Sequence, residues 1–347
     1  MTSFAGWQMP LRYGSETAEH QAVRHAAGLF DLSHMGEIMV SGPGAGQALD
    51  YALTGFLSGL RPGRARYTMI CAADGGVLDD LVVYRQGEQE FLVIANAANT
   101  AVVLGELLSR AAGFDAAVTD ATDDYALIAI QGPAAASILA PLTELDLDAV
   151  KYYAGAFGEV AGVPAWVART GYTGEDGFEL YCRPADAVRL WEALTAAGGP
   201  AGLVPAGLAA RDTLRLEAGM PLYGNELGPD MTPFEAGLGR VVKFDKPGDF
   251  VGRPALLARS LAGPDRELVG LTLQSRRVAR HGYPVFADGI PAGTVTSGAP
   301  SPTLGQPIAM AYLTTDADAR DAVLTVGIRG EAVPAQLTDL PFYSRSR

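Results

Sequence analysis

The hydrophobic pattern of this 347-residue chain changes near residue 264, and this change constrains the fold more than any other feature. After it, short apolar segments recur between Gly and Pro turns, and in the first of them Val269, Leu271 and Leu273 alternate with smaller or polar residues. Strict alternation over a few residues is typical of a half-buried strand. Many short strands with regular turns indicate an antiparallel barrel or sandwich. We therefore expect such a domain after a linker at 261–264.

Before that linker the chain mixes helical and strand patterns, which favours an α+β fold. Strand patterns with hairpin turns dominate residues 67–96, and a helical pattern follows over 98–112. A second series contains strands over 124–131, 159–169 and 178–182 and helices over 134–142, 185–197 and 205–218. The first helical pattern runs from Glu16 to about Leu29, with Gly28 as its expected stop. A chain of this length is expected to form two or three domains.

The chain is strongly acidic, with 26 basic against 39 acidic residues and a formal net charge of −13. A negative field of this size repels phosphate groups, so we expect neither nucleic acid nor an anionic membrane as a partner. The sequence has no signal peptide and no apolar run of the ~18 residues that a spanning helix needs, which predicts a soluble, cytoplasmic protein. Two isolated cysteines and four histidines without zinc spacing predict no metal site.

Two adjacent acids interrupt an otherwise apolar strand pattern at 77–84. Alternation places Asp79 on one face of the strand and Asp80 on the other, together with Tyr84. At least one carboxylate must therefore point into an apolar layer, where it has to be hydrogen-bonded, neutralised or placed at a pocket. The pattern alone leaves two interpretations open, a carboxylate that binds nearby backbone and a functional acid.

Two further segments could carry chemistry. The loop 170–177 has three glycines and leads into a strand with Glu179, and it matches no phosphate-binding loop. The helical pattern over 205–218 places Arg211 and Arg215 on one face, four residues apart. The loop is either an ordinary hairpin connection or part of a binding site. The arginines either face solvent or turn inward toward a carboxylate.

Several motifs run in order along nearly the whole chain and are specific as a set: Phe4-Ala5-Gly6-Trp7, Asp31-Leu32-Ser33-His34-Met35-Gly36, Arg66-Tyr67, Gly75-Gly76-Val77-Leu78-Asp79-Asp80-Leu81, Gln131-Gly132-Pro133, Gly171-Tyr172-Thr173-Gly174-Glu175-Asp176-Gly177-Phe178-Glu179, Gly207 through Gly219, Leu222-Tyr223-Gly224, and Ser301-Pro302-Thr303-Leu304-Gly305. Through these motifs the chain resembles the T-protein family of the glycine cleavage system, the aminomethyltransferases.

This resemblance implies a three-lobed molecule around a central cavity. Residues 1–260 would form two folate-binding α+β lobes, the second at roughly 36–120, and residues 265–347 would form a C-terminal antiparallel Greek-key β-barrel. The resemblance also implies a reaction, in which the aminomethyl group on the lipoyl arm of H-protein passes to tetrahydrofolate. The products would be methylenetetrahydrofolate, ammonia and dihydrolipoyl H-protein.

The resemblance further assigns roles to single residues. Asp79 matches the family's catalytic aspartate, which would orient the folate nitrogens or accept a proton from them. Glu179 matches the acid that binds the pterin N–H groups, and Arg211 matches a further folate-site position. Four more residues are expected to line the folate cavity: Tyr67, Tyr84, Asn96 and Met35.

Other features depart from the family pattern or leave a choice. The chain begins well inside that pattern, so an N-terminal element is expected to be missing, and either Arg345 or Arg347 could hold the folate tail. Arg276, Arg277 and Arg280 could form a basic rim for docking the partner, or a solvated face. Two alternatives to aminomethyl transfer are a folate-dependent demethylase of a sulfonium or methylamine substrate and a non-enzymatic folate-binding relative.

Overall fold

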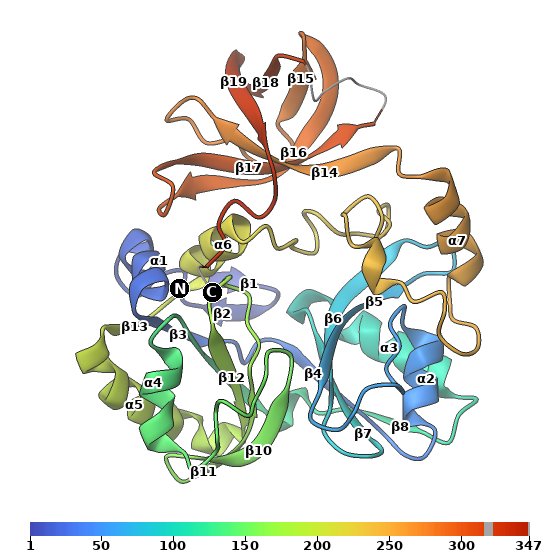
Figure 1. Ribbon diagram of the computed structural model, residues 1–347, viewed down its shortest axis with the longest axis vertical. Coiled ribbons are helices and arrows are strands. Elements are labelled where there is room, and N and C mark those ends of the chain that lie inside the picture. The colour runs from blue at the N-terminus through green and yellow to red at the C-terminus, as the bar shows by residue number, and fades with distance from the viewer. Residues whose placement is uncertain (316–321, 346–347) are drawn as a thin grey trace.

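The computed structural model describes residues 1–315 and 322–345 and has three parts (Figure 1). Two α+β lobes lie side by side, and a β-barrel built from the last strands lies above them. The predicted α+β fold with a C-terminal antiparallel barrel is confirmed. Within the described ranges, no helix combines the length and the hydropathy that crossing a bilayer requires.

The first lobe is a six-stranded sheet of order β10-β11-β12-β9-β3-β13, antiparallel except for the pair β3–β13. Its strands are β3 (Ala27–Asp31), β9 (Ala126–Gln131), β10 (Gly155–Val160), β11 (Val163–Ala168), β12 (Gly177–Cys182) and β13 (Leu203–Pro205). Its helices are α1 (Glu16–His25), α4 (Ala135–Leu139), α5 (Ala187–Gly198) and α6 (Leu208–Glu217), and a small hairpin of β1 (Thr2–Phe4) and β2 (Trp7–Met9) precedes them. α4 and α5 bury the outer face of the sheet, with Leu139, Leu190 and Leu194 in the core.

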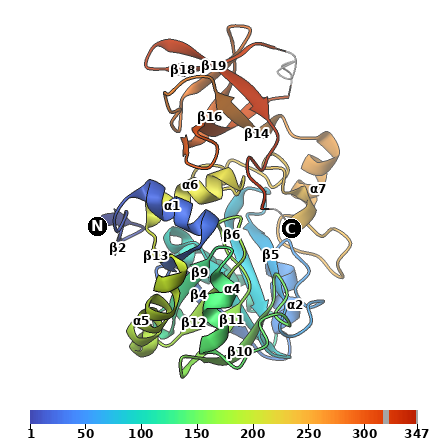
Figure 2. The same cartoon turned by 60° about the vertical axis from the view of Figure 1, so that its left-hand side comes forward.

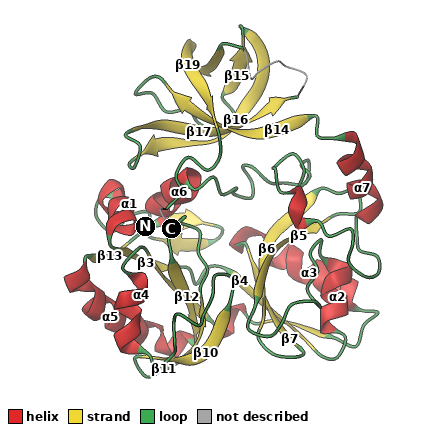
Figure 3. Ribbon diagram, in the orientation of Figure 1, coloured by secondary structure: helices red, strands yellow, loops and turns green. Residues whose placement is uncertain are grey.

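The second lobe is a five-stranded antiparallel sheet of order β5-β6-β7-β4-β8. Its strands are β4 (Gly36–Ser41), β5 (Ala65–Cys71), β6 (Val77–Arg85), β7 (Glu90–Ala95) and β8 (Ala117–Asp120). Two helices, α2 (Ala45–Ala52) and α3 (Thr100–Ala111), cover its outer face, as Figure 3 shows. Leu49 and Val103 from these helices pack against Ile38 and Val83 of the sheet.

A further core, which we call the interlobe core, lies where the inner faces of the two sheets meet. The second lobe contributes Tyr84 and Ile94 to it, and the first lobe contributes Leu127, Trp166 and Tyr181. Side chains alternate along each strand, so residues of β4 and β6 point either toward α2 and α3 or into the interlobe core. This alternation decides which polar side chains can meet between the lobes.

The C-terminal part is a closed barrel of order β14-β17-β16-β15-β18-β19, antiparallel throughout. Its strands are β14 (Arg266–Leu273), β15 (Pro284–Ala287), β16 (Ile290–Ser301), β17 (Gln306–Thr314), β18 (Leu324–Ile328) and β19 (Glu331–Thr338). Because β15, β16 and β17 form a meander and β14 returns beside β17, the order is a Greek key. α1 and α6 lie beneath the barrel (Figure 2), where Leu216 packs against Ile308 and Met310.

A long connection, residues 220–262, runs from α6 across the second lobe to the barrel. It includes α7 (Arg253–Ala262), and its Phe250 and Leu256 pack against Met69 and Cys71 of β5. Gly263, with φ of +78°, ends α7 just before β14. The connection therefore fixes the second lobe to the barrel.

Two details of the predicted secondary structure are wrong. The first helix ends at His25, and residues 27–31 form a central strand, because Gly28 lets α1 fold back onto it. A Cβ at Gly28 would lie 2.4 Å from Val23 Cγ2. The strand predicted over 159–169 is a hairpin of β10 and β11, since Ala161 and Gly162 turn the chain with φ of 51° and 71°.

Candidate functional site

Asp79 lies on the face of β6 that packs against α3. It is 0% exposed and accepts hydrogen bonds from the backbone N–H of Asn96 (3.0 Å), from Asn96 Nδ2 (2.9 Å) and from Asn99 Nδ2 (2.6 Å). Burial, followed by the charge of Asp80, raises the pKa of Asp79 to about 7, and these hydrogen bonds oppose the rise. The carboxylate is thus satisfied by the turn that opens α3.

Asp80 points to the opposite face, toward the interlobe core. Tyr67 of β5 donates its hydroxyl to Asp80 Oδ2 at 3.0 Å, and Asn96 Nδ2 donates to Asp80 Oδ1 at 2.9 Å. Burial raises the pKa of Asp80, while these two hydrogen bonds lower it. Because the same Asn96 amide donates to both acids, it couples Asp79 to Asp80 through the strand.

Glu179 faces the interlobe core from the other sheet, on β12. Its Oε2 accepts hydrogen bonds from the hydroxyls of Thr170 (2.5 Å) and Tyr84 (3.2 Å). Within the described residues its Oε1 has no hydrogen-bond partner, and the side chain is half-buried. One carboxylate oxygen is therefore held in place and the other is available to a ligand.

Arg211 lies on α6 with its guanidinium 4.8 Å above the ring of Tyr172. Burial lowers its pKa, with Tyr172 and Glu179 acting in the opposite direction. Across residues 1–315 and 322–345 the guanidinium forms no ion pair. Arg215, by contrast, is 1% exposed and binds Glu226 at 3.0 Å and Asp212 at 2.8 Å. The arginine that turns inward toward a carboxylate is therefore Arg215, whereas Arg211 has no carboxylate partner among the described residues.

Tyr172 links these groups electrostatically. Burial raises the pKa of Tyr172, and the charge of Asp80 adds to the rise while Arg211 opposes it. We call the half-buried set formed by Asp80, Tyr67, Tyr172, Glu179 and Arg211 the interlobe site. It offers two carboxylates, two phenols and one guanidinium, and both lobes contribute to it.

The structure places the remaining predicted residues around this set. Tyr84 is 0% exposed, and its hydroxyl donates to Glu179 Oε2, so it helps to orient that carboxylate. Met35 is half-buried against the interlobe core, and Asn96 bridges the two aspartates. Asp79, which the resemblance proposed as catalytic, lies on the far side of the β6 strand from Tyr67 and Tyr172.

The sequence analysis assigned a role to Asp79 and none to Asp80, although the structure brings Asp80 beside Tyr67 in the interlobe site. The signal was present, because strand alternation had already grouped Asp80 with Tyr84, a residue expected at the folate cavity. Tyr172 was missed because it lies in a loop without periodicity.

The glycine-rich loop 170–177 wraps around Gln131. Gln131 Nε2 donates to the carbonyl of Thr170 at 3.0 Å, and the Thr173 hydroxyl donates to Gln131 Oε1 at 2.9 Å. A Cβ at Gly171 would lie only 1.9 Å from Gln131 Oε1. The loop therefore needs glycine for this close approach, and it positions Thr170 beside Glu179.

Arg345 and Arg347 were the two candidates for holding the folate tail. Arg345 lies 3.5 Å from Asp176, which also binds Arg169 at 2.6 Å, and Arg347 lies outside the described residues. The described side chains include no cluster of His, Cys, Asp or Glu that could hold a metal ion.

Comparisons with known proteins agree along the whole chain. Residues 1–246 match the family described as the GCVT N-terminal domain, and residues 266–344 match the glycine cleavage T-protein C-terminal barrel domain. The chain is 64% identical over 351 residues to an aminomethyltransferase of Streptomyces avermitilis, covering 100% of this chain and 94% of that protein. It is 63% identical over 346 residues to an aminomethyltransferase of Saccharopolyspora erythraea, covering 99% and 94%.

A solved structure shares the entire fold. The crystal structure of glycine cleavage system aminomethyltransferase T from Bartonella henselae superposes with a TM-score of 0.92 at 38% identity, and the match covers 99% of this chain and 93% of that one. The resemblance drawn from the sequence motifs is therefore confirmed.

Proposed function

The chain belongs to the glycine cleavage T-protein family, an aminomethyltransferase family, and from this premise we propose that its interlobe site binds tetrahydrofolate and receives the aminomethyl group there. The observation that carries the proposal is that Asp80, Glu179 and Arg211, from three separate elements, lie close enough to interact electrostatically: Asp80 and Arg211 both act on Tyr172, and Glu179 acts on Arg211. Each of these side chains can still bind a ligand group or exchange a proton in addition to its contacts within the protein.

Glu179 is suited to hold the pterin ring. Its Oε2 is fixed by Thr170 and Tyr84, which leaves Oε1 to accept a hydrogen bond from the amino or ring N–H groups of the pterin. Arg211, with no carboxylate partner in the described part of the chain, would attract the anionic part of folate, which the net charge of −13 otherwise repels.

Asp80, in our proposal, is the acid that serves the reaction, and Asp79 positions it through Asn96. As two folate nitrogens each form a bond to the methylene carbon, the carbon–nitrogen bond to the departing ammonia and the carbon–sulfur bond to the lipoyl arm break. The two N–H protons of the folate pass to the ammonia and to the thiol. A carboxylate with a raised pKa beside the reacting nitrogens accepts such a proton and stabilises the cationic carbon.

The test compares Asp80→Asn with Asp79→Asn. We expect wild type and Asp80→Asn to bind tetrahydrofolate alike in calorimetry, whereas transfer from aminomethyl-loaded H-protein falls by roughly 100-fold or more in Asp80→Asn. Asp79→Asn should lower the melting temperature, because its new amide N–H₂ faces the donors of Asn96 and Asn99.

The opposite result would restore the original assignment. If Asp79→Asn loses transfer at an unchanged melting temperature and Asp80→Asn does not, Asp79 is the catalytic acid. Turnover of a sulfonium or methylamine donor without H-protein would favour the demethylase alternative.

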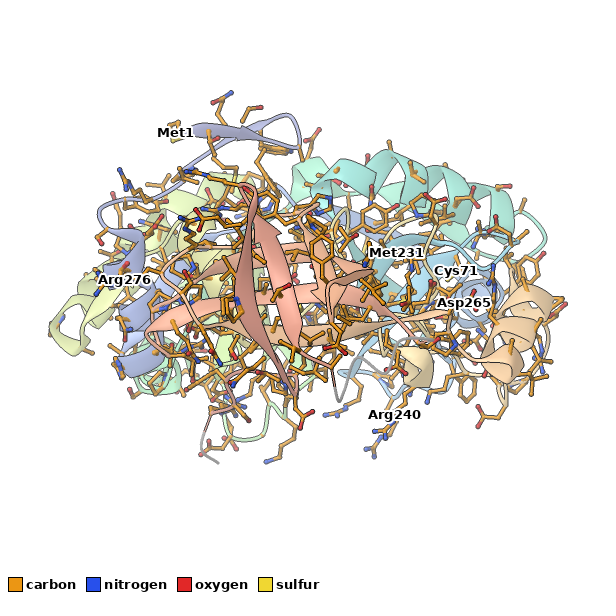
Figure 4. All side chains as sticks on the ribbon, turned by 90° about the horizontal axis from the view of Figure 1, so that it is seen from above. Met1, Cys71, Met231, Arg240, Asp265 and Arg276 are labelled. Atoms are coloured by element: carbon orange, nitrogen blue, oxygen red, sulfur yellow. The ribbon has the colours of Figure 1, made fainter. Side chains whose placement is uncertain are left out.

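The basic rim is proposed as the dock for the lipoylated H-protein. Arg277 and Arg280 line a hollow of about 410 Å³ on the barrel together with Tyr283 and Arg329. In the view from above, Arg276 and Asp265 lie on opposite sides of the barrel (Figure 4). Arg277 pairs with Glu331 at 2.9 Å, so the rim is not purely cationic. We also propose that the protein is cytoplasmic, as the sequence analysis predicts.

Reversing the charge of Arg276, Arg277 and Arg280 together tests the dock. Transfer from H-protein should then require a higher H-protein concentration, and its dependence on salt should weaken. Tetrahydrofolate binding should not change. Equal effects on both measurements, or on neither, would remove the rim from the proposal.

A further inference from the structure

Glu37 on β4 has its side chain in the interlobe core, and the roles proposed above leave it unused. In the sheet register Glu37 is opposite Ile94, a member of that core, whereas the adjacent Ile38 packs with α2 and α3. The residue is 1% exposed. Neither of its carboxyl oxygens has a hydrogen-bond partner within residues 1–315 and 322–345.

The groups around Glu37 keep it uncharged. The charges of two acids act on it, Asp120 at the end of β8 and Glu179 on β12, and the phenols of Tyr125 and Tyr181 are near enough to feel a charge on Glu37 when it ionises. Burial raises the pKa of Glu37 to about 9, with Asp120 and Glu179 adding to the rise. At neutral pH it is therefore a carboxylic acid with one O–H donor and one carbonyl acceptor.

A buried acid without a protein partner weakens the folded state, because its oxygens give up hydrogen bonds to water and gain none in return. An apolar side chain fits this environment better, as Met35 and Met39 show on the same side of the sheet. Polar groups kept against the stability of the fold are typical of functional sites. The charge of Glu179 contributes to the raised pKa of Glu37, so the functional site in question is the interlobe site, to which Glu179 belongs.

We propose that Glu37 is a second, uncharged acid of the folate site and that it hydrogen-bonds the edge of the pterin ring beside Glu179. This inference rests on the proposed binding of tetrahydrofolate. A carboxylate such as Glu179 only accepts hydrogen bonds, so it suits the N–H groups of the ring but not its carbonyl or its unprotonated nitrogens. The O–H of Glu37 supplies the missing donor. Met35, half-buried and unbranched, can change rotamer to admit the ring edge.

The experiment measures two properties of Glu37→Gln, Glu37→Leu and Glu37→Met. One is tetrahydrofolate affinity by anaerobic calorimetry, and the other is the melting temperature of the ligand-free protein. We expect Glu37→Leu and Glu37→Met to melt at or above the wild-type temperature and yet to bind about tenfold more weakly or worse. Glu37→Gln, which keeps a donor and an acceptor without charge, should bind within a few-fold of wild type.

A pH series separates this role from simple packing. Wild-type affinity should fall as the pH rises through about 9, where Glu37 ionises, and the affinity of Glu37→Gln should not show this fall. The same comparison controls for Asp120, Glu179, Tyr125 and Tyr181, since these groups are present in both proteins. Met39→Leu, on the same strand face, is the matched packing control and should bind normally.

Three outcomes would overturn the inference. Wild-type affinity in Glu37→Leu and Glu37→Met would show that the acid does not reach the ligand. An equal loss in Glu37→Gln and Glu37→Leu would show that neither its donor nor its acceptor matters. If wild type itself fails to bind tetrahydrofolate, the proposed function fails together with this inference, which distinguishes that case from the other two.

Discussion

Replacing Glu217 by Gln should loosen the junction between the first lobe and the barrel. The Glu217 carboxylate is 0% exposed at the end of α6. It accepts hydrogen bonds from Arg24 of α1 at 2.9 Å, and from Ser301 at 2.5 Å and Thr303 at 2.7 Å in the barrel. Burial alone would raise the pKa of Glu217, but hydrogen bonds from His20, Ser301 and Thr303 lower it from 4.5 to about 2.

The size of the effect follows from that shift. A fall from 4.5 to about 2 corresponds to about 3 kcal/mol in favour of the ionised carboxylate. Removing one partner of a buried ion pair costs ~3–5 kcal/mol, which agrees. For 347 residues the entropy of unfolding is about 0.7 kcal/mol per degree, so Glu217→Gln should melt about 4 °C below wild type.

The sign of the pH dependence is fixed by the same shift. Because the folded pKa lies below the unfolded value, the stabilisation is present above pH 4.5 and is lost as the pH falls toward 2. The difference between wild type and Glu217→Gln should therefore be full at pH 7 and should shrink below pH 4.5.

Scanning calorimetry across that range is the assay. Glu88→Gln is the matched control, because Glu88 is 83% exposed and pairs only loosely with Arg85, at 3.4 Å. The melting temperature of Glu88→Gln should equal that of wild type at every pH. A Glu217→Gln variant that melts within about one degree of wild type at pH 7 would refute the reasoning. A gap that persists undiminished toward pH 2 would do the same.

Three more predictions concern the interlobe site and its loop. Tyr67→Phe removes a hydroxyl that lowers the pKa of Asp80, so the acid limb of the pH–rate profile for aminomethyl transfer should move to higher pH. If the limb does not move, Asp80 is not the group that transfers the proton. Arg211→Met should weaken tetrahydrofolate binding by roughly tenfold or more in calorimetry, whereas Arg211→Lys should keep part of the affinity. Equal affinity in wild type, Arg211→Met and Arg211→Lys would show that Arg211 does not contribute to folate binding. Gly171→Ala should lower the melting temperature because the new methyl would lie 1.9 Å from Gln131 Oε1. Gly162→Ala meets no atom within 4 Å and is strained only by its φ of +71°, so it isolates the effect of backbone strain. A Gly171→Ala protein as stable as wild type would contradict the close packing of the loop.

Local patterns explain why much of the fold was predictable. The alternation after residue 264 predicted the barrel because strands such as β18 bury every second side chain, as its alternating exposure shows. The failures were also local. Residues 27–31 continued a helical pattern, but they form a central strand because both β9 and β13 pair with it. Such pairing joins segments that are far apart in the chain, and no local pattern reveals it.

The candidate site divides in the same way. The opposite directions of Asp79 and Asp80 follow from the sequence alone, since side-chain alternation is a property of the extended backbone. The sequence also indicates, through its ordered motifs, the family to which the chain belongs. It could not determine which face meets the other lobe.

The packing of the lobes determines which face of β6 meets the other lobe. Asp79 is directed to the start of α3, where Asn96 and Asn99 satisfy it, and Asp80 is directed to the interlobe core, where Tyr67 meets it. The same packing left Glu37 buried without a protein partner. The physical reason is that burial, and hence the pKa and the free hydrogen-bonding capacity of an acid, depends on which distant surfaces close over it.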